Sequence, residues 1–304
     1  MIELRRLRLL HELDRLGTLA AVAESLSLSP SSVSSQLSLL EKELGVPLTE
    51  KVGRGVRLTP AALGLIPHID VMLERLELIS TDLASLDAEP RGTVRVASFQ
   101  SAMIDLVPMM LREVDEHEHL RVEVTQLEPE QAMPALAARG FDLVLGEEFP
   151  KFPAPTFPGV VREPLCRDRL QIAIGSDLEV PRSDPGGVVE LASLRDLPWI
   201  MEPHDTISHA WMLSLCRAAG FEPDVRYESP DQLALVSMVR MGHAVALLPD
   251  LFTSRYGSGV RLHPLPDARR LIFAATRNTH GSTPAMRVIR AALRHAAAVI
   301  DNNV

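Results

Sequence analysis

The chain has 304 residues, a formal net charge of −9 at pH 7, and only two cysteines, Cys166 and Cys216. This length suffices for two or three compact units, and the acidic balance argues against a protein that coats nucleic acid nonspecifically. Two distant cysteines are too few for a disulfide scaffold or a zinc site, and without a signal-like or membrane-spanning apolar run we expect a cytoplasmic protein.

Residues 18–44 predict two short helices joined by a turn. Ser29 can accept a hydrogen bond from an unpaired backbone N–H, and Pro30 suits the first position of a helix. Gly45 follows the last apolar position, where helices often end in a left-handed residue. The second helix is therefore expected from Pro30 to about Leu44. This helix-turn-helix pattern is typical of DNA binding.

The second helix combines an apolar stripe with a polar face. The stripe consists of Val33, Leu37, Leu40 and Leu44 at helical spacing. The other face carries small hydroxyls and an amide, which can approach base edges and phosphates in a major groove. The candidate DNA contacts are Ser29, Ser31, Ser32, Ser34, Ser35 and Gln36. The alternative is a serine-rich face that is merely solvated.

Residues 45–60 predict a glycine-punctuated hairpin, which we interpret as a wing beside the second helix. Its cations Lys51, Arg54 and Arg57 would neutralise phosphates, although they also fit an ordinary surface hairpin. Residues 1–58 hold eight cationic and seven acidic side chains, a net charge of +1. We therefore expect modest nonspecific affinity for DNA.

A long helix is expected from Pro60 to about Leu86, kinked near Pro67. Its apolar residues alternate spacings of four and three, the repeat of a coiled-coil seam. The seam residues are Leu65, Ile69, Met72, Leu76, Ile79, Leu83 and Leu86. A two-fold dimer through this seam would place two DNA-binding modules on a pseudo-palindromic site. Alternatively, the stripe packs on its own domain.

The rest of the chain alternates strands with helices, which predicts an α/β fold with a mainly parallel sheet. Expected strands lie at 94–97, 122–127, 143–145, 170–174, 199–201, 225–227 and 244–248. Their arrangement in two sets is consistent with two lobes.

Several segments together resemble LysR-type transcriptional regulators over the whole chain: residues 3–7 (ELRRL), the helix-turn-helix, 40–48 (LEKELGVPL) and 56–61 (VRLTPA). The resemblance implies an α-rich winged helix-turn-helix at 1–58, a linker and dimerisation helix with a hinge at 59–91, and an effector-binding domain at 92–304. That α/β domain would be built like a periplasmic binding protein, with lobe I at 92–161 and 266–304 and lobe II at 162–265. The chain departs from the family at Ser35 and Ser38, often arginines, and at Thr49, often aromatic.

Ligands of such open sheets bind at the carboxyl ends of strands, often near helix N-termini. The candidate effector contacts are Ser98, Phe99, Gln100, Ser101, Glu147, Pro203, His204, Asp205 and Thr206. Ser101 and Thr206 are equally explained as helix caps. Carboxylates at Glu147, Glu202 and Asp205 favour a cationic group on the ligand, whereas helix N-termini could hold a carboxylate.

The sequence therefore predicts a LysR-type regulator that binds double-stranded DNA and a small polar metabolite. The resemblance implies a homodimer or homotetramer and contact with RNA polymerase. A thiol- or peroxide-responsive regulator that uses Cys166 or Cys216, and a solute-binding protein without DNA activity, are the alternatives. No motif of an enzyme, a metal site or a cofactor site occurs, so neither catalysis nor a cofactor is expected.

Overall fold

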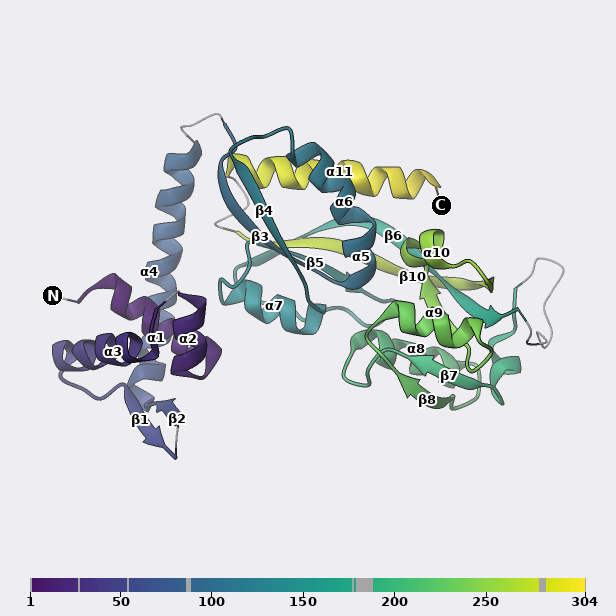
Figure 1. The fold of residues 1–304 in the computed structure, drawn as a ribbon, viewed down its shortest axis with the longest axis horizontal. Helices are drawn as coiled ribbons and strands as arrows, with labels where there is room; N and C mark the ends of the chain where they lie inside the picture. The colour runs from purple at the N-terminus through teal and green to yellow at the C-terminus, as the bar shows by residue number, and fades with distance from the viewer. Residues whose placement is uncertain are drawn as a thin grey trace. The chain divides into compact units, whose positions relative to one another are not determined.

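The computed structural model describes residues 2–26, 28–53, 55–85, 89–176, 178, 188–278 and 283–303. The protein divides into two compact units, an N-terminal unit up to residue 86 and a C-terminal unit from residue 87 (Figure 1). The expected linker helix therefore belongs to the same unit as the expected winged module. None of the described helices is long and apolar enough to cross a membrane.

The N-terminal unit is a small helical module with one hairpin. Its elements are α1 (Leu4–Leu16), α2 (Leu19–Ser25), α3 (Pro30–Leu44), β1 (Thr49–Val52), β2 (Gly55–Leu58) and α4 (Pro60–Ser85). Side chains from all three short helices and from the hairpin share one core, in which Leu10, Val33, Leu40 and Leu48 are fully buried. The order of elements is that of a winged helix-turn-helix.

The ends of α3 confirm the prediction from the sequence. The Ser29 hydroxyl accepts a hydrogen bond from the Ser32 N–H at 3.2 Å, and Pro30 occupies the first turn. Gly45 has a φ of 72°, and its N–H donates to the Glu41 carbonyl at 2.8 Å. The predicted stripe faces inward, since Val33, Leu37 and Leu40 are buried.

One carboxylate fastens the hairpin to α3. The Glu41 Oε1 atom accepts hydrogen bonds from the Leu48 N–H, the Thr49 N–H and the Thr49 hydroxyl, each at 2.9 Å. A charged acceptor strengthens each of these bonds relative to a neutral one. Thr49 therefore anchors the wing by a polar contact.

The linker helix α4 divides into a buried and an exposed part. Leu65 and Ile69, predicted as part of the dimer seam, pack into the core of the N-terminal unit, and Ile69 is only 2% exposed. That part of the prediction is corrected, because the short helices of the module need this face of α4 to complete their core. Four seam residues remain exposed, namely Met72, Leu76, Ile79 and Leu83. Leu86 lies outside the described residues. Pro67 lies within α4.

One six-stranded sheet runs through the C-terminal unit, in the order β4-β3-β5-β10-β6-β9. The strands are β3 (Gly92–Ser98), β4 (Leu120–Gln126), β5 (Leu143–Glu148), β6 (Val160–Gly175), β9 (Ala246–Pro249) and β10 (Val260–Arg277). Only β3, β4 and β5 are parallel; β10 is antiparallel to both neighbours, and β9 is antiparallel to β6. The predicted mainly parallel sheet is therefore wrong beyond β5, because apolar runs do not reveal strand direction.

The first lobe surrounds β3, β4 and β5. Its helices are α5 (Gln100–Ile104), α6 (Leu106–Val114), α7 (Pro129–Ala137) and α11 (Pro284–Asn303). Helices α6 and α11 pack together on one face of the sheet, while α7 covers the other face (Figure 1). The helical segment after β3 is interrupted at Asp105, whose carboxylate accepts a hydrogen bond from Arg255 at 2.7 Å.

The second lobe has its own aromatic core around Trp199, Trp211 and Phe149. Its elements are η1 (Leu191–Leu194), β7 (Pro198–Met201), α8 (Ile207–Ala218), β8 (Asp224–Glu228), α9 (Gln232–Arg240) and α10 (Asp250–Tyr256). Strands β7 and β8 form a separate parallel pair, and Trp199 bridges to Val245 beside β9. The long paired strands β6 and β10 join this lobe to the first.

Candidate functional site

Arg270 is the centre of a buried polar network in the C-terminal unit. Its side chain is only 3% exposed, and it donates to the Asp168 carboxylate from Nε at 2.9 Å and from Nη2 at 2.6 Å. Nη1 donates to Glu147 at 2.5 Å, and Nη2 also donates to the Ser101 hydroxyl at 2.6 Å. The guanidinium lies 5.1 Å from the centre of the Phe99 ring. One arginine thus ties together β5, β6, β10 and α5.

Two buried carboxylates share this single cation. Burial raises the pKa of Glu147 and of Asp168 above the usual range for carboxyl groups, and Arg270 opposes both shifts. Burial also disfavours the charge on Arg270, but Glu147 and Asp168 together raise its pKa above the usual value. The network therefore places one permanently charged guanidinium between two carboxyl groups whose ionisation is opposed by burial.

More glutamates surround Glu147, and we call Glu128, Glu130, Glu147 and Glu202 the acidic cluster. Burial, followed by the charges of Glu202, Glu147 and Glu130, raises the pKa of Glu128 to about 8. Burial likewise raises the pKa of Glu202, which follows β7. Glu128 and Glu130 lie at the start of α7. The cluster therefore combines carboxylates from both lobes.

Hydrogen bonds join the two lobes beside the acidic cluster. The Glu130 carboxylate of the first lobe accepts from the Ile207 N–H at the start of α8, at 2.8 Å. The Gln100 side chain donates to Asp231 at 2.8 Å and accepts from the Gln232 N–H at 2.7 Å, both at the start of α9. Three polar contacts thus tie α5 and α7 to helix N-termini of the second lobe.

Gln232 carries an unsatisfied buried atom at this junction. Its side-chain Nε2 lies 3.5 Å from the Glu202 carboxylate, whereas its Oε1 atom is buried and has no hydrogen-bond partner among the described residues. The residue is only 4% exposed. An unpaired buried acceptor costs about 1–3 kcal/mol, and a hydrogen-bond donor beside it would remove that cost.

The structure brings some predicted effector contacts to this junction and leaves others outside it. Glu147, Ser101, Phe99 and Gln100 all belong to the network or to the lobe contacts. Ser98 is buried and donates to the Phe99 carbonyl at 3.1 Å.

The loop after β7 fits its alternative interpretation as a helix cap. The Thr206 hydroxyl donates to the Pro203 carbonyl at 2.7 Å and accepts from the His209 N–H at 3.2 Å. His204 is exposed and lies 3.2 Å from the Glu228 carboxylate, and Asp205 is exposed as well.

Arg270, Asp168, Glu128 and Gln232 were missed from the sequence as site residues. A signal existed for two of them, because side chains alternate between the faces of a strand. Arg270 has the same parity as the buried Ala268 and Ile272, and Asp168 has that of Cys166 and Leu170. A charged residue that points to the same face of a strand as the buried residues on either side of it indicates an internal ion pair.

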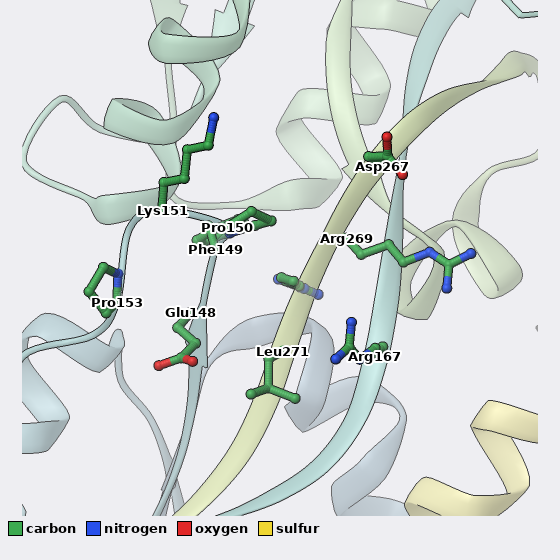
Figure 2. A pocket seen from close by; sticks show the side chains of 10 residues that line it. Glu148, Phe149, Pro150, Lys151, Pro153, Arg167, Asp267, Arg269 and Leu271 are labelled. Carbon is green, nitrogen blue, oxygen red and sulfur yellow. The ribbon is translucent and has the colours of Figure 1, made fainter.

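The C-terminal unit also has a cavity of about 660 Å³ beside the crossing strands β6 and β10. Its lining includes Lys151, Arg167, Arg269, Glu148 and Asp267. Figure 2 shows that the charged ends of Lys151, Glu148 and Arg269 point in different directions. Arg270 also belongs to this lining, but its guanidinium donates to Asp168, Glu147 and Ser101. The Arg270 network is therefore the better-defined polar site.

The candidate DNA-binding face on α3 is largely exposed. Ser29, Ser31, Ser34 and Ser35 are exposed, as is Ser38, while Ser32 is half-buried. Gln36 is half-buried, and its oxygen accepts from Arg6 Nε at 3.0 Å. Arg6 also pairs with Glu43 at 2.5 Å. The side-chain oxygen of Gln36 is therefore already occupied by a hydrogen bond within the protein, which leaves less of this side chain to contact DNA bases.

The cations of the wing differ in their surroundings. Arg57 pairs with Glu50 across the hairpin at 2.6 Å, and both side chains are exposed, so solvent screening makes this pair weak. Lys51 is exposed and makes no ion pair with another described residue. Arg54 lies outside the described residues.

Both cysteines are free and buried. Burial raises the pKa of Cys166 and of Cys216 to about 12. Because the thiolate is the reactive form, neither environment favours thiol chemistry at neutral pH.

A winged helix-turn-helix linked to a two-lobed α/β domain with a polar junction defines a DNA-binding transcriptional regulator with an effector-binding domain. Two family models match the chain, the LysR substrate binding domain over residues 87–298 and the bacterial regulatory helix-turn-helix protein of the lysR family over residues 4–63. The chain belongs to the LysR family of transcriptional regulators.

Known members of the family match most of the chain. It is 26% identical over 251 residues to the transcriptional dual regulator GltC of Bacillus subtilis. The aligned residues cover 82% of this chain and 81% of GltC. It is 28% identical over 292 residues to the regulator TfdS of Cupriavidus pinatubonensis, covering 94% and 96% respectively. A full-length OxyR variant from Pseudomonas aeruginosa shares the fold with a TM-score of 0.72 at 19% identity, covering 97% of this chain and 95% of that one.

The raised pKa of Glu128 gives a testable pH dependence of stability. The unfolded state loses this proton near pH 4.5 and the folded state near pH 8, so the group lowers stability progressively as the pH rises between these values. Glu128→Gln should therefore raise the free energy of unfolding at pH 8 by about 1–3 kcal/mol, after allowance for solvent screening, and leave it unchanged at pH 4. Both tryptophans, Trp199 and Trp211, lie in the C-terminal unit, so their fluorescence during urea unfolding measures the effect.

The exposed Glu116→Gln is the matched control, and it should leave the curve of stability against pH unchanged. Equal pH dependence in the Glu128→Gln variant and the unaltered protein would contradict the assignment.

Proposed function

We propose that this regulator binds pseudo-palindromic DNA through a pair of α3 helices and responds to a small polar metabolite bound where its two lobes meet. The observation that carries the second part is the acidic cluster around Arg270, which is flanked by hydrogen bonds between the lobes. Polar groups of this kind, converging from two lobes, are what a ligand-gated closure requires.

The DNA-binding part rests on the exposed face of α3 and on the free end of α4. Ser31, Ser34 and Ser35 present hydroxyls on a helix of the width that a major groove admits. The exposed stripe on α4 pairs with the same stripe of a second copy, giving a dimer with two reading helices. Such a dimer acts at promoters, where it contacts RNA polymerase.

Regulation follows from the contacts between the lobes. Gln100 and Glu130 hold α9 and α8 of the second lobe in the observed arrangement. A ligand that competes for these groups favours another degree of closure, which changes how the sensor domains pack in the oligomer. The spacing of the two DNA-binding modules then changes with ligand.

Two experiments test the proposal. Selection of bound duplexes from random DNA should yield two related half-sites at a fixed spacing, and a search that returns no enriched duplex would refute the DNA-binding part. A thermal-shift screen of small metabolites should find compounds that stabilise the C-terminal unit by mass action. DNA binding that responds to none of the stabilising compounds would refute the regulatory part.

Substitutions can distinguish a residue that contacts DNA bases from one that contacts phosphates. Ser35→Ala should weaken binding to the selected site by about five-fold and relax its sequence preference, because one polar contact is worth about 1 kcal/mol. Lys51→Ala should instead weaken binding to all duplexes and lower the slope of log affinity against log salt by about one. Fluorescence anisotropy on specific and scrambled duplexes at several salt concentrations distinguishes the two.

Ser254→Ala in the C-terminal unit is the control and should bind as the unaltered protein does. An unchanged preference at every base in the Ser35→Ala variant would show that this serine reads none of them.

A further inference from the structure

We infer that the effector is an organic cation, a small molecule with protonated amino groups and without a carboxylate, held by the acidic cluster and the Gln232 amide oxygen. This inference deepens the proposed function and rests on it, since it names the class of ligand for the same site. Four features of the described residues carry it.

The first feature is an excess of carboxyl groups over cations. Arg270 pairs with Glu147 and Asp168, and no other ion pair among the described residues reaches the acidic cluster. Glu128, Glu130 and Glu202 form no ion pair with a described cation; the charges of Glu130 and Glu202 raise the pKa of Glu128, and Arg270 opposes this shift only in part. A cation is the ligand that would relieve this repulsion.

The second feature is the unpaired acceptor. The terminal amide of Gln232 lies against Glu202, with its Nε2 toward the carboxylate and its Oε1 without a partner. Since a carbonyl oxygen can only accept, the group that satisfies it must be a donor. An ammonium or guanidinium group can donate to Oε1 and to the neighbouring carboxylates at the same time.

The third feature is that Arg270 has little capacity left for an anion. The guanidinium has five N–H donors, and four of them already serve Asp168, Glu147 and Ser101. A carboxylate ligand would meet the acidic cluster with at most one free donor from this arginine.

The fourth feature concerns the N-termini of α8 and α9 in the second lobe, since helix N-termini are places where a ligand carboxylate could bind. The Ile207 N–H of α8 donates to Glu130, and the Leu233 N–H of α9 donates to the side chain of Asp231. Carboxylates of the protein itself therefore occupy these positions. An anionic ligand would have to displace them.

Proton release provides an independent signature of cation binding. The groups that face Glu128 are Glu130 on α7, Glu147 on β5, Glu202 after β7 and Arg270 on β10. Burial and the three glutamates keep Glu128 largely protonated at pH 7, and a bound cation favours its ionised form. Binding should release a proton and strengthen as the pH rises toward 8.

A series of four-carbon probes with matched length tests the inference on the full-length protein. The probes are 1,4-diaminobutane, 4-aminobutanoate and butanedioate, which carry two, one and no ammonium groups. We expect 1,4-diaminobutane to raise the melting temperature of the C-terminal unit, followed by tryptophan fluorescence, and butanedioate to have no effect. Calorimetry in two buffers of different ionisation enthalpy should show proton release.

Two conservative variants locate the binding. Glu202→Gln should weaken diamine binding at least about ten-fold, because it removes a charged acceptor. Glu128→Gln should reduce the proton release, and the part that remains comes from Glu147 and Glu202, whose pKa values are raised as well. The exposed Glu116→Gln controls for attraction to the acidic surface and should bind as the unaltered protein does.

Stabilisation by butanedioate but not by the diamine, no effect of any probe, or equal loss in Glu116→Gln and Glu202→Gln would each overturn the inference. The proposed function fails in a different experiment, since duplex selection needs no effector. A protein that binds paired half-sites but ignores the diamine remains a regulator with another class of ligand.

Discussion

Replacement of Arg270 by methionine should destabilise the C-terminal unit by about 3–5 kcal/mol at neutral pH. Methionine retains much of the buried side-chain volume but leaves Glu147 and Asp168 without their cation in an environment that disfavours charge. The loss should shrink at acid pH, where both carboxyl groups are protonated. Urea unfolding followed by tryptophan fluorescence between pH 4 and pH 8 measures both effects.

Its neighbour supplies the control. Arg269 points to the opposite face of β10 and is exposed, so Arg269→Met should change the free energy of unfolding by less than about 0.5 kcal/mol. Adding Glu147→Gln and Asp168→Asn to Arg270→Met should recover part of the lost stability. Equal stability of the Arg269 and Arg270 variants would mean that the network contributes nothing.

The double substitution Ile79→Glu and Leu83→Glu should prevent the protein from forming a dimer through α4. These side chains are 54% and 63% exposed, so the folded N-terminal unit tolerates the change, whereas two copies in a seam would juxtapose like charges. Affinity for a duplex with two half-sites should fall by about 100-fold or more, because the second module loses its effective concentration. Sedimentation analysis and anisotropy on one-site and two-site duplexes measure the change.

Leu63→Glu tests whether any charge on α4 has the same effect. Leu63 is 52% exposed but lies outside the seam, so this variant should bind both duplexes as the unaltered protein does. If the double variant kept its preference for two half-sites, the dimer would have to form elsewhere.

Local features of the fold were predictable from the sequence because their determinants are local. Ser29, Pro30 and Gly45 fix the ends of α3 through contacts within four residues, and the structure confirms each. The hairpin followed from its glycines in the same way. The role of Glu41, by contrast, was not predicted, because its three donors come from Leu48 and Thr49, seven and eight residues further along the chain.

The long strands show where reasoning from periodicity ends. In β6, only residues 170–174 form an apolar run, while Arg162, Glu163 and Arg167 interrupt the preceding part. Those charged residues lie in the sheet because β10 pairs with them along its length. Neither the antiparallel direction nor the extent of this pairing has a local signature.

Only part of the candidate site was predicted from the sequence, because only part of it has a local signature. Ser101 and Glu147 were proposed because they lie at or just after the carboxyl ends of expected strands, a rule that needs only the order of elements. Arg270 lies 123 residues beyond Glu147 and 102 beyond Asp168, so no spacing rule connects them. The unpaired oxygen of Gln232 has no sequence counterpart, since it depends on how one side chain is surrounded.

The attachment of Thr49 and Leu48 to Glu41 has a consequence for the DNA sequences that this protein can use. Because one carboxylate oxygen of α3 accepts from Leu48 and Thr49, we expect the start of the hairpin to keep its position relative to α3. In the proposed complex, the distance between the bases that α3 contacts and the DNA phosphates that the hairpin contacts is therefore the same at every operator. Variation among operators is then confined to the stretch between half-sites, where bending of the duplex takes up the difference.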